Sequence, residues 1–141
     1  MNSFLWYARV YYEDTDAGGV VYYANYLKYM ERARTEWLRC LGVEQDELSI
    51  KMNILFAVRS VNIEYKQPAR FNDALEISVE PMALKSASIS FQQTITKQHD
   101  DSVLATAQVN VVCLSSSDFK PQAIPKSLHM KIQQGETNNA C

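Results

Sequence analysis

The sequence predicts an α+β fold in which an antiparallel five-stranded sheet wraps around one long helix. Three features favour this fold: one strand-like segment at the start, one segment of helical period after it, and four segments of alternating apolar and polar residues in the rest of the chain. The chain has 141 residues and neither internal repeats nor a linker, so it has the length of one domain. We expect this domain over residues 1–132 and a flexible tail over residues 133–141.

The first strand is predicted over residues 5–13, where aromatic and β-branched residues are frequent and apolar residues alternate. The segment from Asp14 to Gly19 breaks this period, as Asp and paired Gly residues do in turns. A helix is predicted over residues 22–41 because residues spaced three or four apart form an apolar stripe, and Gly42 supplies a stop signal. The stripe consists of Tyr22, Tyr26, Met30, Ala33 and Trp37. Since apolar residues also occur outside the stripe, we expect other structure to cover this helix.

Four strands are predicted after Gly42 and a short polar stretch with helical character. They are expected over residues 56–65, 75–80, 87–96 and 103–113. The last three alternate cleanly, which is typical of antiparallel strands with one covered face. In the first, the parity of the apolar residues changes near Arg59 and Ser60, which predicts a bulge. Pro125 is predicted to begin a short closing helix.

The charge and the apolar content of the chain exclude several classes of protein. The formal net charge is -2, whereas a nucleic-acid binder carries a concentrated basic face, so we expect no nucleic-acid partner. No apolar run approaches the roughly 20 residues of a membrane-spanning helix, and the N-terminal residues lack the pattern of a signal peptide. We therefore expect no integral membrane segment and a cytoplasmic location. Three well-separated cysteines, Cys40, Cys113 and Cys141, predict reduced thiols and neither a metal site nor a cofactor.

The densest group of reactive residues lies between residues 12 and 23, where the first strand ends and the helix begins. It contains Glu13, Asp14 and Asp16 together with the pair Gly18 and Gly19. A helix N-terminus presents unpaired N–H groups, which can stabilise an oxyanion, and glycine lets a ligand approach the backbone closely. A carboxylate beside such donors can attack an acyl group or activate water. From the residues alone the alternative stays open that Asp14 or Asp16 only caps the helix or closes an Asx turn.

This segment resembles the signature of the 4-hydroxybenzoyl-CoA thioesterase family. The matching residues run from Asp14 to Tyr26 and from Glu31 to Glu36, and the similarity covers about residues 5–130, including the segment from Tyr65 to Arg70. Within the family, the chain is most similar to the branch associated with the bacterial Tol–Pal envelope system. The resemblance implies the hotdog fold, whose order of elements is the one predicted above, and the activity of an acyl-CoA thioesterase.

The resemblance also implies roles for individual residues. Asp16 stands at the position of the catalytic carboxylate, as nucleophile or as general base, and Tyr23 at the position whose backbone amide polarises the thioester carbonyl. The Tol–Pal branch usually has His at that second position, whereas the benzoyl-CoA branch has Tyr. Lys85 and Ser86 resemble the region that contacts the pantetheine and nucleotide parts of CoA. Further basic candidates for the CoA phosphates are Arg59, Lys120 and Lys126.

The resemblance implies an acyl-CoA substrate and a homo-oligomer, commonly a dimer of dimers. The alternative to a hydrolase is a non-catalytic binding or scaffold protein of the same fold that holds acyl-CoA or an acyl carrier protein. Asp16 within its full motif favours the hydrolase, because a non-catalytic relative could lack it.

Overall fold

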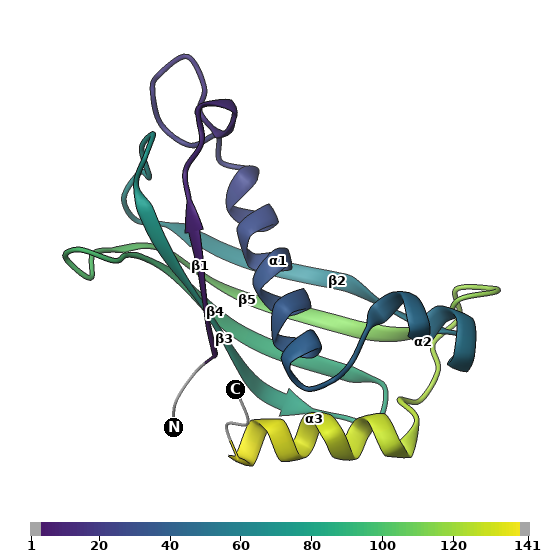
Figure 1. Ribbon diagram of the computed structural model, residues 1–141. Coiled ribbons are helices and arrows are strands. Elements are labelled where there is room, and N and C mark those ends of the chain that lie inside the picture. Colours follow the sequence, from purple (N-terminus) through teal and green to yellow (C-terminus); the bar gives the residue numbers. More distant parts are fainter. Residues whose placement is uncertain (1–3, 139–141) are drawn as a thin grey trace.

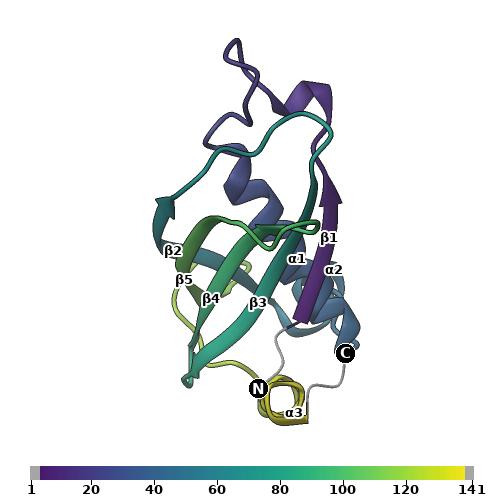
Figure 2. The same cartoon turned by 90° about the vertical axis from the view of Figure 1, so that its left-hand side faces the viewer.

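The computed structural model describes residues 4–138, in which one five-stranded antiparallel sheet has the strand order β1-β3-β4-β5-β2. The strands are β1 (Phe4–Arg9), β2 (Ile54–Tyr65), β3 (Ala74–Leu84), β4 (Ser88–Lys97) and β5 (Val103–Ser115). The helices are α1 (Asn25–Cys40), α2 (Gln45–Met52) and α3 (Lys126–Asn138). The curved sheet wraps around α1, and α3 lies across one end of the sheet (Figures 1 and 2). The predicted α+β fold is confirmed.

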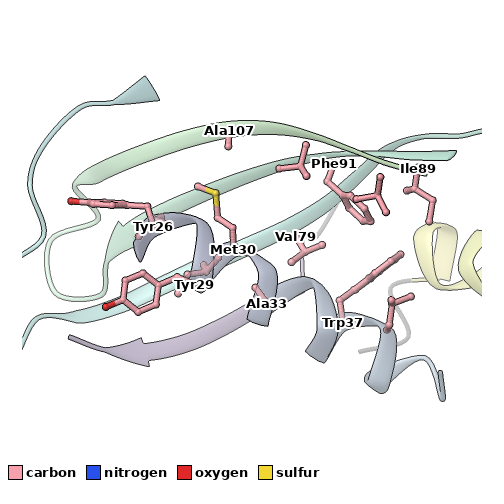
Figure 3. Packing of buried hydrophobic residues seen from close by; sticks show 14 of the residues in the cluster. Tyr26, Tyr29, Met30, Ala33, Trp37, Val79, Ile89, Phe91 and Ala107 are labelled. Atoms are coloured by element: carbon pink, nitrogen blue, oxygen red, sulfur yellow. The ribbon is translucent and has the colours of Figure 1, made fainter. Parts of the chain in front are cut away.

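The core lies between α1 and the face of the sheet that α1 covers. Figure 3 shows Met30, Ala33 and Trp37 of α1 pointing toward the strands. Met30 and Ala33 are completely buried, and the Trp37 ring packs edge-on against Phe91 of β4 with 5.4 Å between centroids. The spacing of three to four residues therefore places one stripe of α1, from Tyr26 to Trp37, on the sheet as the sequence predicts. Tyr22, which is also expected in this stripe, lies before the helix and is exposed.

A buried polar group fixes α1 on this face. Gln93 of β4 is completely buried, and its Nε2 donates to the carbonyl oxygens of Met30 (3.1 Å) and Ser78 (3.2 Å). Arg34 donates to Gln93 Oε1 at 2.9 Å. Because each of these groups would lose hydrogen bonds if the helix moved, the network sets the position of α1 along the sheet.

Several predicted details are confirmed. The register of β2 against β5 shifts between Val58 and Ser60, where the change of parity predicts a bulge. The polar stretch after Gly42 contains α2, and α3 begins directly after Pro125. Cys113 is buried with a free thiol, and burial raises the pKa of this thiol.

Other details differ from the predictions. β1 ends at Arg9 rather than at residue 13, because Tyr12–Asp14 form a 3-10 turn. α3 continues to Asn138, through residues expected to form the tail, and residues 139–141 lie outside the described part of the chain. Cys40 is disulfide-bonded, which corrects the prediction of a reduced thiol at that position, and Cys141 is outside the described residues. No helix within residues 4–138 is long and apolar enough to cross a membrane.

Candidate active site

The loop between β1 and α1 extends beyond one end of the sheet (Figure 1) and is held against α1 by Asp14. Asp14 Oδ2 accepts the backbone N–H of Tyr11 at 2.8 Å and the hydroxyl of Tyr29 at 2.9 Å. The backbone oxygen of Asp14 accepts the amide of Tyr22 at 3.0 Å and the side-chain amide of Asn25 at 2.9 Å. Asp14 therefore connects the start of the loop to its end and to the helix.

Tyr29 makes this connection a buried one, since only 2% of this residue is exposed. Burial, and then the hydrogen bond to Asp14, raise the pKa of the Tyr29 hydroxyl, so that it remains a donor. The side chain of Asp14 thus has a structural role, although among the described residues it neither caps α1 nor closes an Asx turn, the two structural alternatives that the sequence leaves open.

Asp16 lies two residues further on, in a tight hairpin. Thr15 and Val21 form an antiparallel bridge, and the amide of Asp16 donates to the carbonyl of Val20 at 2.9 Å. Asp16 Oδ1 accepts the N–H of Gly18 at 2.8 Å, which closes an Asx turn. Within residues 4–138 the other carboxylate oxygen, Oδ2, has no hydrogen-bond partner, and the residue is exposed. The Asx turn therefore holds one oxygen of Asp16 and leaves the second available.

The two glycines of the hairpin are needed for different structural reasons. A Cβ on Gly18 would lie 3.3 Å from Asp16 Oδ1, so any side chain there would crowd the carboxylate. Gly19 has a φ of +77°, a conformation that residues with a Cβ rarely adopt, although nothing lies within 4 Å of its missing Cβ. Gly18 keeps space beside Asp16, and Gly19 allows the chain to turn.

The turn that leads into α1 presents free backbone donors. The helix begins at Asn25 rather than at Tyr22 as predicted, so Tyr23 and Ala24 form the turn before it. The amide of Asn25 donates to the carbonyl of Tyr22 at 2.8 Å. In the described part of the chain, neither the amide of Tyr23 nor that of Ala24 has an acceptor, and no side chain caps the helix. These two N–H groups are available to a ligand.

The hairpin brings the carboxylate and this turn close together, since Thr15 pairs with Val21 and the Tyr22 amide donates to the Asp14 carbonyl at 3.0 Å. The hydrogen bond with the Tyr23 side chain and the proximity of Tyr23 raise the pKa of Tyr22 most, and the charge of Asp16 raises it further. The rings of Tyr22 and Tyr23 lie 4.9 Å apart between centroids. A shallow hollow of about 240 Å³ opens beside them, lined by Tyr23, Tyr26, Tyr65, Lys66, Gln67 and Pro68.

The structure thus brings Asp16, Gly18, Gly19 and Tyr23 together, but it does not bring the predicted CoA-binding residues to them within one chain. Arg59 is exposed at the bulge in the middle of β2. Lys85 and Ser86 form the turn between β3 and β4, at the end of the sheet opposite the Asp16 hairpin (Figure 1). Of the weaker candidates, Lys120 precedes the bridge between Leu114 and Pro121, and Lys126 is the first residue of α3.

The roles of Asp14, Tyr29 and Tyr65 were not predicted from the sequence. From the residues alone, Asp14 is one of three carboxylates in its segment, and no local pattern predicts its bonds to Tyr11 and Tyr29. Tyr65 belongs to the segment quoted for the family resemblance, but its hydroxyl donates to the carbonyl of Tyr23 at 3.1 Å across 42 positions of sequence. No local pattern indicates a contact of that range.

Comparison with known proteins assigns the chain to a family. Residues 10–132 match the model of the Thioesterase-like superfamily. The chain therefore belongs to this superfamily, and the predicted family and hotdog fold are confirmed. The chain is 44% identical over 136 residues to the acyl-CoA thioester hydrolase YbgC of Escherichia coli O6:H1, covering 95% of this chain and 100% of that one.

Solved structures agree with this assignment. A probable thioesterase from Bartonella henselae superposes with a TM-score of 0.82 at 34% identity, covering 88% of this chain and 100% of that one. A 1,4-dihydroxy-2-naphthoyl-CoA thioesterase from Synechocystis has a TM-score of 0.86 over 97% of both chains, and at 21% identity it supports the fold alone.

Proposed function

We propose that this protein hydrolyses the thioester bond of an acyl-CoA to release CoA and a carboxylic acid. The observation that carries the proposal is the free oxygen of Asp16 in the same loop as the two unpartnered amides of Tyr23 and Ala24. A carboxylate and backbone donors together are what acyl transfer to water requires. The name of the Escherichia coli relative supports an acyl-CoA as the substrate.

In the proposed reaction, the thioester carbonyl oxygen accepts the amide of Tyr23, which stabilises the charge that develops on that oxygen. Asp16 then acts in one of two ways. As nucleophile, it forms a C–O bond while the C–S bond breaks, which gives a mixed anhydride and the CoA thiolate, and water hydrolyses the anhydride. As general base, it takes a proton from water while that water attacks the carbonyl carbon, and the thiolate leaves. Neither path requires a Ser-His pair, because a thiolate is a good leaving group.

The test is thiol release from a panel of acyl-CoA esters by wild type and the Asp16→Asn variant. We expect kcat to fall about 100-fold or more, the usual scale for loss of a proton-transfer group. Equal rates of thiol release by the two proteins would remove Asp16 from the mechanism. Tight binding of acyl-CoA or of an acyl carrier protein without any thiol release by wild type would favour the scaffold alternative instead.

A single turnover in ¹⁸O-labelled water reveals the nucleophilic path when water attacks the Asp16 carbon of the anhydride, because only then does label enter the protein. Attack on the acyl carbon would label the acid, as general-base catalysis does. If Asp16 is the nucleophile, the first acid molecule released contains no label when water attacks the Asp16 carbon, and the label appears in the protein. If Asp16 is a general base, the first acid molecule already carries one labelled oxygen.

We further infer that two copies of the chain pair along β2. β2 is an edge strand of 12 residues, and Val58 and Val61, on the face that α1 covers elsewhere, are 47% and 38% exposed. A long edge with exposed apolar residues is unusual in a protein that stays monomeric. Antiparallel pairing of identical strands gives a closed two-fold dimer, which is the most common oligomer.

Such a dimer would bring the second copy's CoA-binding candidates toward Asp16. Tyr65, at one end of β2, contacts Tyr23, whereas the β3–β4 turn lies near the other end of β2, because Ser88 pairs with Val112 and Val112 with Ala57. Antiparallel pairing along β2 reverses these ends in the second copy. Lys85 and Ser86 of one copy would then lie at the same end of the joined sheet as the Asp16 hairpin of the other.

Mixing two variants tests this shared site. Asp16→Asn and a Lys85→Glu variant with weakened CoA binding are each expected to be poorly active alone, and light scattering is expected to give at least twice the 16.1 kDa chain mass. After exchange of subunits, half of the dimers contain one intact site of two, so about a quarter of wild-type activity should return. Activity no higher than the sum of the separate variants would exclude a site shared in this way.

A further inference from the structure

Two successive peptide groups present the free amides at the start of α1, and each is held by its carbonyl oxygen. The first joins Tyr22 to Tyr23, and its oxygen accepts the amide of Asn25 at 2.8 Å. The second joins Tyr23 to Ala24, and its oxygen accepts the hydroxyl of Tyr65 at 3.1 Å. A peptide group is planar, with its C=O and N–H on opposite sides. A hydrogen bond to the oxygen therefore also fixes the direction of the N–H.

The second peptide depends on a side chain from a distant part of the sequence. The only other donor to the Tyr23 oxygen in the described residues is the amide of Tyr26, at 3.4 Å, near the limit for a hydrogen bond. The Tyr65 hydroxyl is closer, and it comes from the last residue of β2. The Tyr65 bond is thus the stronger constraint on the peptide that carries the Ala24 amide.

The ring of Tyr65 is held so that its hydroxyl points at this carbonyl. Tyr26 contacts the ring edge-on at 5.1 Å between centroids and 84°, and Tyr23 does so at 6.2 Å and 88°. Partial burial raises the pKa of Tyr65, and the nearby Tyr23 and Tyr26 raise it further. The hydroxyl therefore stays protonated and can only donate to the carbonyl at neutral pH.

We propose that Tyr65 is a positioning residue for thioester hydrolysis. By holding the Tyr23–Ala24 peptide, its hydroxyl directs the Ala24 amide outward, so that Ala24 joins Tyr23 as a second donor to the oxyanion. Oxyanion sites are commonly built from two such donors that are fixed before the reaction. This inference rests on the proposed function, since it adds a donor and its support to the same reaction.

Tyr65→Phe tests the proposal because it removes the hydroxyl and keeps the ring that packs on Tyr26. Complete loss of an oxyanion donor reduces kcat about 100- to 1,000-fold. Here the Ala24 amide remains but is less well directed, so we expect about a 10-fold fall in kcat. KM should stay within about twofold, since the donor matters more to the transition state than to the bound substrate. The fall should be the same for acyl groups of different length.

Tyr26→Phe is the matched control. It also removes one tyrosine hydroxyl from the same cluster, but within the described residues that hydroxyl accepts the buried amide of Ala69 at 2.9 Å and makes no hydrogen bond with the Tyr23 peptide. Removing the Tyr26 hydroxyl leaves the buried N–H of Ala69 unsatisfied, so this variant should have a lower melting temperature while keeping at least half of kcat. Tyr65→Phe should show the opposite pattern, with little change in melting temperature and the fall in kcat.

The outcomes separate this inference from the proposed function. Suppose that wild type hydrolyses acyl-CoA and that Asp16→Asn is inactive. A Tyr65→Phe variant with wild-type kcat would then overturn the role of Tyr65 and leave the proposed function intact. A change in KM alone would overturn it as well. If Tyr65→Phe melts at a lower temperature than Tyr26→Phe, kcat of both is compared at a temperature where both are folded, and equal kcat values there would count against Tyr65.

Discussion

Replacing Asp14 and Asp16 separately by alanine should separate stability from catalysis within one loop. The two carboxylates lie two positions apart, and both belong to the same motif. Asp14 Oδ2 accepts hydrogen bonds from the Tyr11 amide and from the buried Tyr29 hydroxyl. Asp16 accepts one bond, from the exposed Gly18 amide, and keeps one oxygen free within the described residues.

The expected loss of stability in each variant follows from the hydrogen-bonding group that the substitution leaves without a partner. In Asp14→Ala, the Tyr29 hydroxyl is left buried and unsatisfied, which costs about 1–3 kcal/mol, and the Tyr11 bond contributes about 1 kcal/mol more. The free energy of unfolding should therefore fall by about 2–4 kcal/mol. In Asp16→Ala, the Gly18 amide is exposed and can bind water, so the loss should stay below about 1 kcal/mol.

The assay is urea unfolding followed by tryptophan fluorescence, which reports on Trp6 of β1 and on Trp37 against Phe91, together with thiol release at a temperature where both variants are folded. Asp14→Ala should be unstable and still turn over, and Asp16→Ala should be stable and inactive. Equal losses of stability would refute the structural role given to Asp14. An inactive but fully stable Asp14→Ala variant would show that the two carboxylates act together in the chemistry.

Two further predictions concern the same region. Gly19→Ala should cost about 1–2 kcal/mol of stability from its positive φ alone, measured by thermal unfolding, since no atom lies near the added methyl group; an unchanged melting temperature would contradict this. Tyr29 has a pKa raised above its ordinary value of 10.0, so its contribution to stability is fully present below pH 10.0 and is lost as the pH rises through the folded pKa. Urea titrations from pH 8 upward should therefore show a shallower alkaline loss of stability in Tyr29→Phe than in wild type, and parallel curves would exclude this contribution.

The sequence predicts the sheet and the core helix well because both depend on local periods. The alternation along β4 and β5 indicates which residues face α1, and the change of parity near Arg59 locates the bulge. The termini of elements are predicted less well. α1 begins at Asn25 because Val20 and Val21 are held in an extended conformation by Arg70 and Ala69, which lie about fifty positions away in sequence.

The candidate site follows the same rule. Asp16, Gly18 and Gly19 are recognisable because they lie in one short segment. Without the family resemblance, the residues alone do not distinguish Asp14 from Asp16, because the difference depends on the contact of Asp14 with Tyr29 and on the open hairpin around Asp16. The sequence also does not indicate that Lys85 lies far from Asp16 within one chain, because this separation follows from the order of the strands.

The strand order also affects how the chain folds during synthesis. β1 and β2 are the outer strands, yet their neighbours β3 and β5 come later in the sequence. A nascent chain that ends before Val103 therefore contains β2 without the strand it pairs with, and it lacks the buried apolar residues that β5 adds to the core. Contacts of such long sequence separation form late and leave apolar segments exposed meanwhile. On the ribosome, this protein should therefore remain open until β5, its last strand, has emerged. A chaperone bound to the nascent chain until then would protect its exposed apolar segments.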